Sequence, residues 1–154
     1  MRILIVEDDQ NKLRQLASFI RNKWPGFVID ESRSYQSGLE KILSGGHDLV
    51  LLDMSMPTYD RSPHETGGRP RKFAGKEILR KMQRKALRTP VLIVTQFESF
   101  SDGGNLVSLQ ELRQQLRTGF LDNYIDTVYY NSAHDNWQFE LERHISQVQE
   151  SGES

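Results

Sequence analysis

Acidic side chains follow two apolar runs of this sequence, and their spacing suggests metal chemistry. Glu7, Asp8 and Asp9 come directly after residues 3–6, and Asp53 follows residues 49–52. Such runs are typical of buried parallel strands, whose carboxyl ends meet at one edge of a sheet. At about 4 Å and an effective dielectric constant near 20, each pair of carboxylates costs about 4 kcal/mol. A cation relieves this repulsion, and oxygen ligands in an open site favour Mg²⁺. The sequence therefore predicts a magnesium ion beside one reactive aspartate.

A strand and a helix alternate five times along the chain. This alternation predicts a parallel α/β sheet with helices on both faces. Residues 102–105, Asp-Gly-Gly-Asn, predict a turn. We expect residues 1–149 to form one domain and residues 150–154 to form a disordered tail. The expected strands are residues 2–6, 27–30, 48–53, 91–95 and 127–131. The first three expected helices are residues 11–23, a helix from the N-cap Ser34 to Gly45, and residues 76–87. A fourth helix contains residues 109–116, and a fifth follows Asp135.

The composition is that of an ordinary globular protein. The 154 residues carry a net charge of −1, and 36% of them are hydrophobic. The absence of cysteine excludes disulfides and thiolate metal sites. No apolar run approaches the ~18 residues of a membrane span, and the first strand begins at residue 2, which leaves no room for a signal peptide. We therefore expect a cytoplasmic protein without a membrane partner.

Basic residues gather in one part of the chain. Residues 61–88 contain ten Lys or Arg side chains against Glu65 and Glu77. This segregation predicts a docking surface for a protein partner. Anion or nucleic-acid binding through residues 61–88 is an alternative, but the segment has neither interleaved aromatics nor a helix-turn-helix pattern, so nucleic acid is the less favoured partner.

Two motifs resemble the receiver domain of two-component response regulators. Residues 2–9, Arg-Ile-Leu-Ile-Val-Glu-Asp-Asp, are similar to the first strand and acidic pair of that family, and residues 53–57, Asp-Met-Ser-Met-Pro, are similar to its Asp-x-x-Met-Pro motif. Thr95 matches the hydroxyl residue at the end of strand four. The resemblance implies a flavodoxin-like (βα)5 three-layer sandwich with the parallel sheet order 2-1-3-4-5.

The resemblance also implies a role for each matching residue. Asp53 is expected to accept a phosphoryl group from a histidine kinase or phosphotransfer protein. Asp8 is the expected direct ligand of Mg²⁺, with Asp53 and the carbonyl of Ser55 completing the protein ligands and Glu7 acting through water. Thr95 is expected to contact the phosphoryl group. The protein would then be a phosphorelay acceptor that assists its own phosphoryl transfer rather than an enzyme.

Signal output is the less defined part of this hypothesis. Tyr129 or Tyr130 is the candidate for an aromatic switch residue. Output is expected through contacts with an unknown downstream protein, as in a stand-alone receiver, and a homodimer through the face formed by residues 106–149 is one form of it.

Receivers normally carry a Lys after strand five, and this sequence has no Lys there. Residues 131–133 are Asn-Ser-Ala, and placing the strand at 124–125 does not supply a Lys either. The connection at 59–74 is unusually long and basic, so we expect it to form a docking surface and to provide the cation, with a disordered loop as the alternative. The candidates for this cation are Arg61, Arg69, Arg71 and Lys72. The alternative is a pseudo-receiver that is never phosphorylated.

Overall fold

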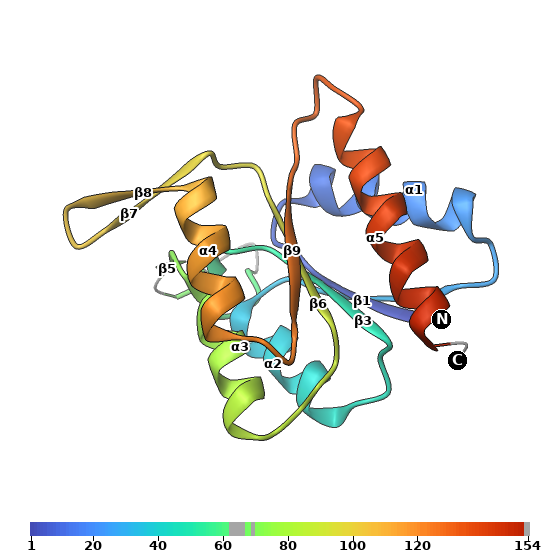
Figure 1. Ribbon diagram of the computed structural model, residues 1–154, viewed down its shortest axis with the longest axis horizontal. Helices are drawn as coiled ribbons and strands as arrows, with labels where there is room; N and C mark the ends of the chain where they lie inside the picture. The colour runs from blue at the N-terminus through green and yellow to red at the C-terminus, as the bar shows by residue number, and fades with distance from the viewer. Residues whose placement is uncertain (62–66, 69, 153–154) are drawn as a thin grey trace.

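A five-stranded parallel sheet forms the centre of the computed structural model, which describes residues 1–61, 67–68 and 70–152 (Figure 1). The strand order is β2-β1-β3-β6-β9. Because β6 and β9 are the fourth and fifth strands of this sheet along the chain, this is the flavodoxin-like order 2-1-3-4-5 that was expected. The five strands are β1 (Arg2–Val6), β2 (Val28–Ser32), β3 (Leu49–Leu52), β6 (Val91–Thr95) and β9 (Tyr124–Tyr129).

Five helices cover the two faces of the sheet and complete the three layers. Successive side chains of a strand point to opposite faces. In β1, Ile3 and Ile5 therefore pack in the hydrophobic cluster of α1 and α5, whereas Leu4 and Val6 pack in the cluster of α2, α3 and α4. The helices are α1 (Gln10–Lys23), α2 (Tyr35–Ser44), α3 (Ala74–Arg84), α4 (Leu109–Gly119) and α5 (Asn136–Gly152).

Polar side chains set the starts of three helices. Ser34 caps α2 in a capping box with Ser37, which confirms the predicted N-cap. Asp9 caps α1 by accepting a hydrogen bond from the backbone N–H of Lys12. Ser108 caps α4 in the same way. The cap at Asp9 matters most for function, because it places the first turn of α1 against the carboxyl edge of the sheet.

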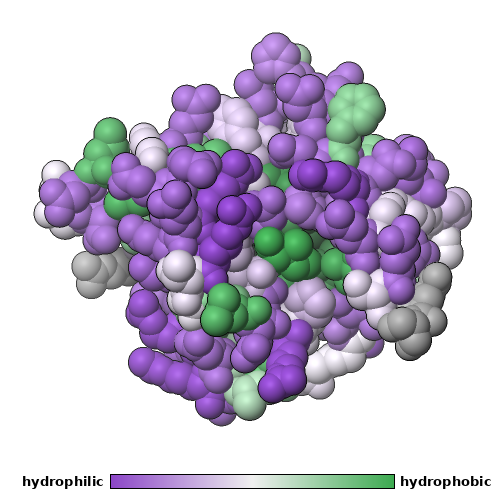
Figure 2. All heavy atoms as spheres, viewed as in Figure 1, coloured by the Kyte–Doolittle hydropathy of each residue, from purple (hydrophilic) through white to green (hydrophobic). Residues whose placement is uncertain are grey.

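Two short antiparallel pairs extend from the connections. β4 (Met56–Pro57) pairs with β5 (Pro70–Arg71), and β7 (Ser99–Asp102) pairs with β8 (Asn105–Ser108). The predicted turn joins β7 and β8, with Gly103 and Gly104 at positive φ. The hairpin itself was not predicted, because its strands are mostly polar. It projects from the body, and a hydrophobic patch lies over it on an otherwise largely hydrophilic face (Figures 1 and 2).

Several predicted boundaries differ from the structure by a few residues, as in β2, predicted at 27–30, and α3, predicted at 76–87. Two further differences are more consequential. The fifth strand runs over Tyr124–Tyr129 rather than 127–131, because β9 pairs with β6 from Val91 onward. The predicted tail at 150–154 is helical as far as Gly152, since Val148 still packs on the core and Ser151 donates a hydrogen bond to the carbonyl of Gln147. Residues 153–154 lie outside the described part. No helix among the described residues is long and apolar enough to span a membrane.

Candidate functional site

The two acidic segments meet at the carboxyl edge of the sheet. β1 and β3 pair in parallel up to Val6 and Leu52, so the residues that follow lie side by side. Glu7 is 2% exposed and Asp53 is 5% exposed. Both line a cavity of about 430 Å³, together with Asp8 and Ser55. The structure thus brings together the four residues expected to form the phosphorylation and metal site.

A lysine that the sequence analysis missed lies among these carboxylates. The Nζ atom of Lys12 is 2.7 Å from Oε2 of Glu7 and 3.5 Å from Oδ1 of Asp53. It also donates a hydrogen bond of 2.7 Å to the carbonyl of Val94, and its side chain is 1% exposed. Its position in the sequence gave a signal, because it stands four residues before the core residue Leu16 and so shares the buried face of α1.

Burial makes the negative charge in this pocket costly. Desolvation raises the pKa of Glu7 to about 8, the Lys12 ammonium opposes this rise, and the nearby Asp53 adds to it. The backbone N–H of Asp9 also donates to Oε1 of Glu7 at 3.0 Å. Loss of hydration is the largest cause of this rise, so a proton or a further cation entering the pocket would relieve the cost of its negative charge.

Backbone packing holds Asp53 in position. Its Oδ1 atom accepts a hydrogen bond of 2.7 Å from the N–H of Met54. The start of α3 lies directly against this segment, because the N–H of Gly75 donates to the carbonyl of Met54 at 3.0 Å. A Cβ atom at Gly75 would lie 2.8 Å from the carbonyl oxygen of Asp53. Only glycine allows α3 to approach the acidic segment this closely.

Thr95 and the two tyrosines lie at the end of β6 and β9. Thr95 is fully buried, its Oγ1 accepts from the N–H of Phe97 at 3.2 Å, and its carbonyl accepts from the N–H of Tyr130 at 2.7 Å. Tyr130 is buried against Trp137, with ring centroids 5.1 Å apart. Tyr130 therefore packs in the core, and Tyr129, which is partly exposed, remains the better candidate for a mobile aromatic. The contact of Thr95 with a phosphoryl group stays a prediction.

The basic connection contributes one cationic side chain to the cavity among its described residues. Arg61 lines the cavity, with Nη2 3.3 Å from Oδ2 of Asp8. Arg71 is engaged elsewhere, because its guanidinium lies 4.1 Å from the ring centroid of Tyr35 and bonds to Glu77. Lys72 lines a different cavity beside Arg71, and Arg69 lies outside the described residues.

The oxygen donors at this edge fit a magnesium ion. Asp8, Asp53 and Ser55 all line one cavity and present hard oxygen ligands. In the described part of the chain, no three His, Cys, Asp or Glu side chains form a metal site on their own. Mg²⁺ binds through one or two carboxylates with water and phosphate oxygens, so it does not require three such side chains. The side chain of Asp9 is occupied as the helix cap.

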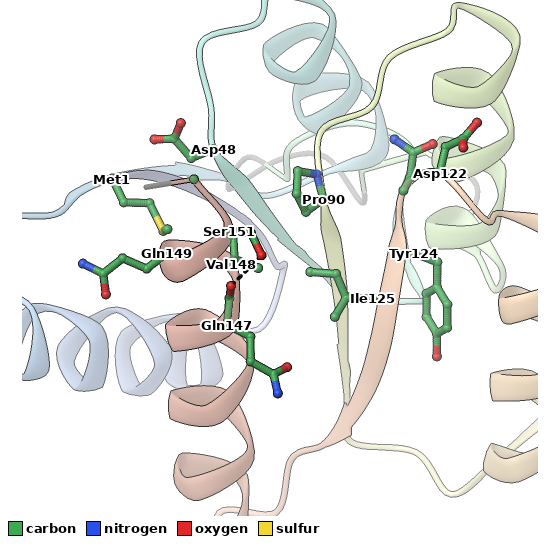
Figure 3. A pocket seen from close by; sticks show the side chains of 12 residues that line it. Met1, Asp48, Pro90, Asp122, Tyr124, Ile125, Gln147, Val148, Gln149 and Ser151 are labelled. Atoms are coloured by element: carbon green, nitrogen blue, oxygen red, sulfur yellow. Dashed lines mark hydrogen bonds between the residues drawn. The ribbon is translucent and has the colours of Figure 1, made fainter. Parts of the chain in front are cut away.

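A larger cavity lies at the opposite end of the strands and carries no comparable chemistry. Its volume is about 720 Å³, and Asp48 and Asp122 lie on opposite sides of it (Figure 3). One oxygen of Asp48 accepts a hydrogen bond from the N–H of Arg2. Acidic side chains do not converge here, so the smaller cavity at the carboxyl edge is the candidate site.

Comparison with known proteins shows the family of this chain. The family model of the response regulator receiver domain matches residues 3–110. The chain therefore belongs to the response regulator receiver family of two-component signalling.

Two relatives match over nearly their full length. The Detocs response regulatory protein DtcB of Enterobacter cloacae is 30% identical over 150 residues, which cover 96% of this chain and 100% of DtcB. An uncharacterized protein, y4jR, of Sinorhizobium fredii is 30% identical over 141 residues, which cover 90% of this chain and 92% of that protein.

Solved structures share the fold. The response regulator TrrA of Thermotoga maritima, in complex with Mg²⁺ and beryllofluoride, has a TM-score of 0.62 at 22% identity and covers 96% of this chain and 97% of that one. A two-component response regulator of Clostridium difficile has a TM-score of 0.64 at 17% identity and covers 100% and 99% of the two chains.

Proposed function

We propose that this receiver accepts a phosphoryl group on Asp53 from a phosphohistidine of a kinase or phosphotransfer protein. The observation that carries the proposal is the position of Asp53, which is nearly buried at the edge of a cavity that it shares with Asp8 and Ser55. A carboxylate in such a place can reach a phosphoryl group inserted into the cavity while bulk water is largely excluded.

The transfer is a nucleophilic displacement at phosphorus. A carboxylate oxygen of Asp53 forms a bond to phosphorus, the phosphorus–nitrogen bond breaks, and its electron pair stays on the imidazole nitrogen, which then takes up a proton. The product is an acyl phosphate on Asp53. Asp8, Asp53 and the carbonyl of Ser55 would hold Mg²⁺, with Glu7 in support; when bound, the ion neutralises charge on the transferring group. The protein assists one transfer to itself and is not a turnover enzyme.

Output would follow from the residues attached to the end of β6. Thr95 is linked to Tyr130 and to Phe97, and the chain continues from Phe97 into the β7–β8 hairpin and α4. A shift of Thr95 toward a phosphoryl group would therefore move this surface. The similarity to DtcB, a response regulatory protein, supports a role in response regulation, and output by protein contacts is part of the proposal. A homodimer through residues 106–149 remains one form of that hypothesis.

Intact-mass spectrometry after incubation with acetyl phosphate and Mg²⁺ tests the proposal. The wild-type chain should gain one phosphoryl group, and Asp53→Asn should gain none. Asp48→Asn, which alters an acid at the opposite end of the sheet, should be modified like the wild type. If the wild type stays unmodified with small donors and with histidine kinases, the pseudo-receiver alternative holds. Under that alternative, Lys12 would act only as the permanent counter-ion of Glu7 and Asp53.

A further inference from the structure

Lys12 is the buried cation of the acidic pocket, and its surroundings are polar on several sides. Its ammonium contacts a Glu7 oxygen and the Val94 carbonyl, both at 2.7 Å, and lies 3.5 Å from Asp53. Taking a lysine out of water is costly unless its charge is paired and its donors are satisfied. A hydrophobic side chain would fill this place in α1 at lower cost, so the ammonium is well placed to have a chemical role.

We propose that Lys12, from the first turn of α1, is the cation that contacts the phosphoryl group on Asp53. This inference rests on the proposed phosphorylation and adds the residue that stabilises its product. After β9, where receivers carry a Lys, this chain has Tyr130. The ring centroid of Tyr130 lies 5.9 Å from the Nζ atom of Lys12. The positive charge therefore enters the same region from a different element of the fold.

The start of α1 positions this side chain. Asp9 accepts a hydrogen bond of 2.9 Å from the N–H of Lys12, which sets the backbone of that residue. Side chains in a helix tilt toward its N-terminus. For Lys12, that direction leads to the acidic loop that begins at Glu7. The lysine is thus held from both ends, by the helix cap at its backbone and by Glu7 and Val94 at its ammonium.

The number of donors on the ammonium matches this role. A lysine has three N–H donors. Two contacts at 2.7 Å engage Glu7 and the Val94 carbonyl, so a third donor is available on the side of Asp53. The distance of 3.5 Å to Asp53 is longer than a hydrogen bond of normal length. A phosphoryl oxygen attached to Asp53 would carry more charge and accept this donor at shorter range.

Burial separates Lys12 from the other cation at the pocket. The side chain of Lys12 is 1% exposed, whereas that of Arg61 is 58% exposed and pairs with Asp8. Water and salt screen an exposed charge far more than a buried one. Lys12 is therefore the stronger source of stabilisation for charge on Asp53, in place of the basic connection.

Chemical restoration of the amine provides the main test, because the chain contains no cysteine. Lys12→Cys introduces a single thiol. Treatment with 2-bromoethylamine in denaturant, followed by refolding, restores a side chain of nearly lysine length and charge, whereas iodoacetamide gives a neutral one. We expect phosphorylation by acetyl phosphate to be about 100-fold slower in the neutral form, the size of effect seen when one stabilising donor is lost. The aminoethylated form should recover to within a few-fold of wild type.

A matched lysine and a second variant guard against effects on folding. Lys23→Cys, at the other end of α1, undergoes the same two treatments and should be phosphorylated at the wild-type rate in both forms. If the neutral form at position 12 does not refold, the double variant Lys12→Met/Glu7→Gln is used in its place. It removes both members of the Lys12–Glu7 ion pair, so neither is left buried and unpaired. It should be phosphorylated at least about tenfold more slowly than Glu7→Gln alone.

Ligand binding distinguishes contact with the phosphoryl group from a merely structural role. Lys12→Met should bind beryllofluoride, a mimic of the phosphoryl group, at least about tenfold more weakly at saturating Mg²⁺. Its affinity for Mg²⁺ alone should be equal or higher, because a positive charge has left the pocket. Equal beryllofluoride binding, or a parallel loss of both affinities, overturns the inference. If wild type is phosphorylated and the neutral form reacts equally fast, only the role of Lys12 fails. If wild type is neither phosphorylated nor bound by beryllofluoride, the proposed function fails with it.

Discussion

Two clusters of carboxylates and cations lie in different parts of this receiver, and they differ in which charge is in excess. In the acidic pocket, defined by Glu7, Asp8 and Asp53, three carboxylates face Lys12 and Arg61. The Asp126 cluster has the opposite balance, with one carboxylate close to three basic side chains. These are Arg113 and Arg117, both 3.5 Å away, and His144 at 3.4 Å.

The balance of charge explains why one cluster is a candidate site and the other is structural. The acidic pocket borders a cavity and holds more acidic than basic side chains, so a further cation would stabilise the ionised form of its carboxyls. Asp126 is already surrounded by positive charge, and its Oδ1 also accepts a hydrogen bond of 2.7 Å from the N–H of Thr127. An acid already paired with neighbouring basic groups can stabilise α4, β9 and α5 but has little attraction for a further cation.

The largest expected effect is the loss of magnesium binding on removal of Asp8. Asp8→Ala should weaken Mg²⁺ binding at least about tenfold, since even residues that only support metal ligands contribute about 10- to 100-fold. Asp126→Ala, which removes a carboxylate from the other cluster, should bind Mg²⁺ like the wild type. Isothermal titration calorimetry measures both. Equal affinities for all three proteins would place the metal elsewhere.

The second largest expected effect is a loss of stability when the Asp126 cluster, rather than the acidic pocket, is altered. Asp126→Ala removes the acceptor of the Thr127 N–H and the counter-charge of Arg113 and Arg117, which should lower the free energy of unfolding by about 1–3 kcal/mol. The rate of phosphorylation should not change. Urea unfolding measures the loss, with exposed Asp122→Ala as the control. A change below about 0.5 kcal/mol, the range of ordinary surface substitutions, would show that the cluster is not a stabilising element.

The acid side of the stability curve should report on His144. Burial lowers the pKa of His144 below its ordinary value of 6.5, although Asp126 opposes this shift. Its Nδ1 atom is buried without a hydrogen-bond partner among the described residues. As the pH falls, the unfolded chain therefore binds a proton at His144 at a higher pH than the folded chain does. The stability that neutral His144 contributes is fully present above pH 6.5 and is lost as the pH falls from there through the lowered pKa.

His144→Gln should remove this part of the pH dependence. Urea midpoints measured from about pH 8 down to about pH 5 should fall less steeply in the variant than in wild type, with exposed His134→Gln as the control. A variant that loses stability on acidification as steeply as wild type would mean that His144 does not contribute to it.

The fold could be predicted because the strands that form the sheet centre are continuous apolar runs. Residues 3–6, 49–52 and 91–94 are buried almost completely, and their order along the chain leaves few topologies. The fifth strand was harder to place, since residues 124–130 mix buried and partly buried side chains without a regular period. The β7–β8 hairpin escaped prediction because polar strands carry no periodic signal.

The sequence predicted the acidic residues of the site but not Lys12, its buried cation. Glu7, Asp8 and Asp53 directly follow apolar strands, so their meeting at one edge follows from the parallel sheet alone. Lys12 belongs to a helix, and its approach to Asp53 depends on where α1 packs across the sheet. The sequence predicted a cation from residues 59–74 because that connection is basic. In the structure, however, Arg71 of this connection contacts Tyr35 and Glu77.

The smallest expected effect concerns Arg61, and it sharpens the comparison between the two cations of the acidic pocket. Arg61 is 58% exposed, and its contact with Asp8 is 3.3 Å long. Exposed ion pairs contribute at most about 1 kcal/mol, so Arg61→Gln should change the phosphorylation rate by less than about fivefold. Because Arg61 competes with a metal for Asp8, the affinity for Mg²⁺ should rise slightly. Intact-mass time courses and calorimetry, run beside Lys12→Met, compare the two cations directly. A loss of more than tenfold in Arg61→Gln together with normal phosphorylation of Lys12→Met would assign the stabilising cation to the basic connection and return Lys12 to a structural role.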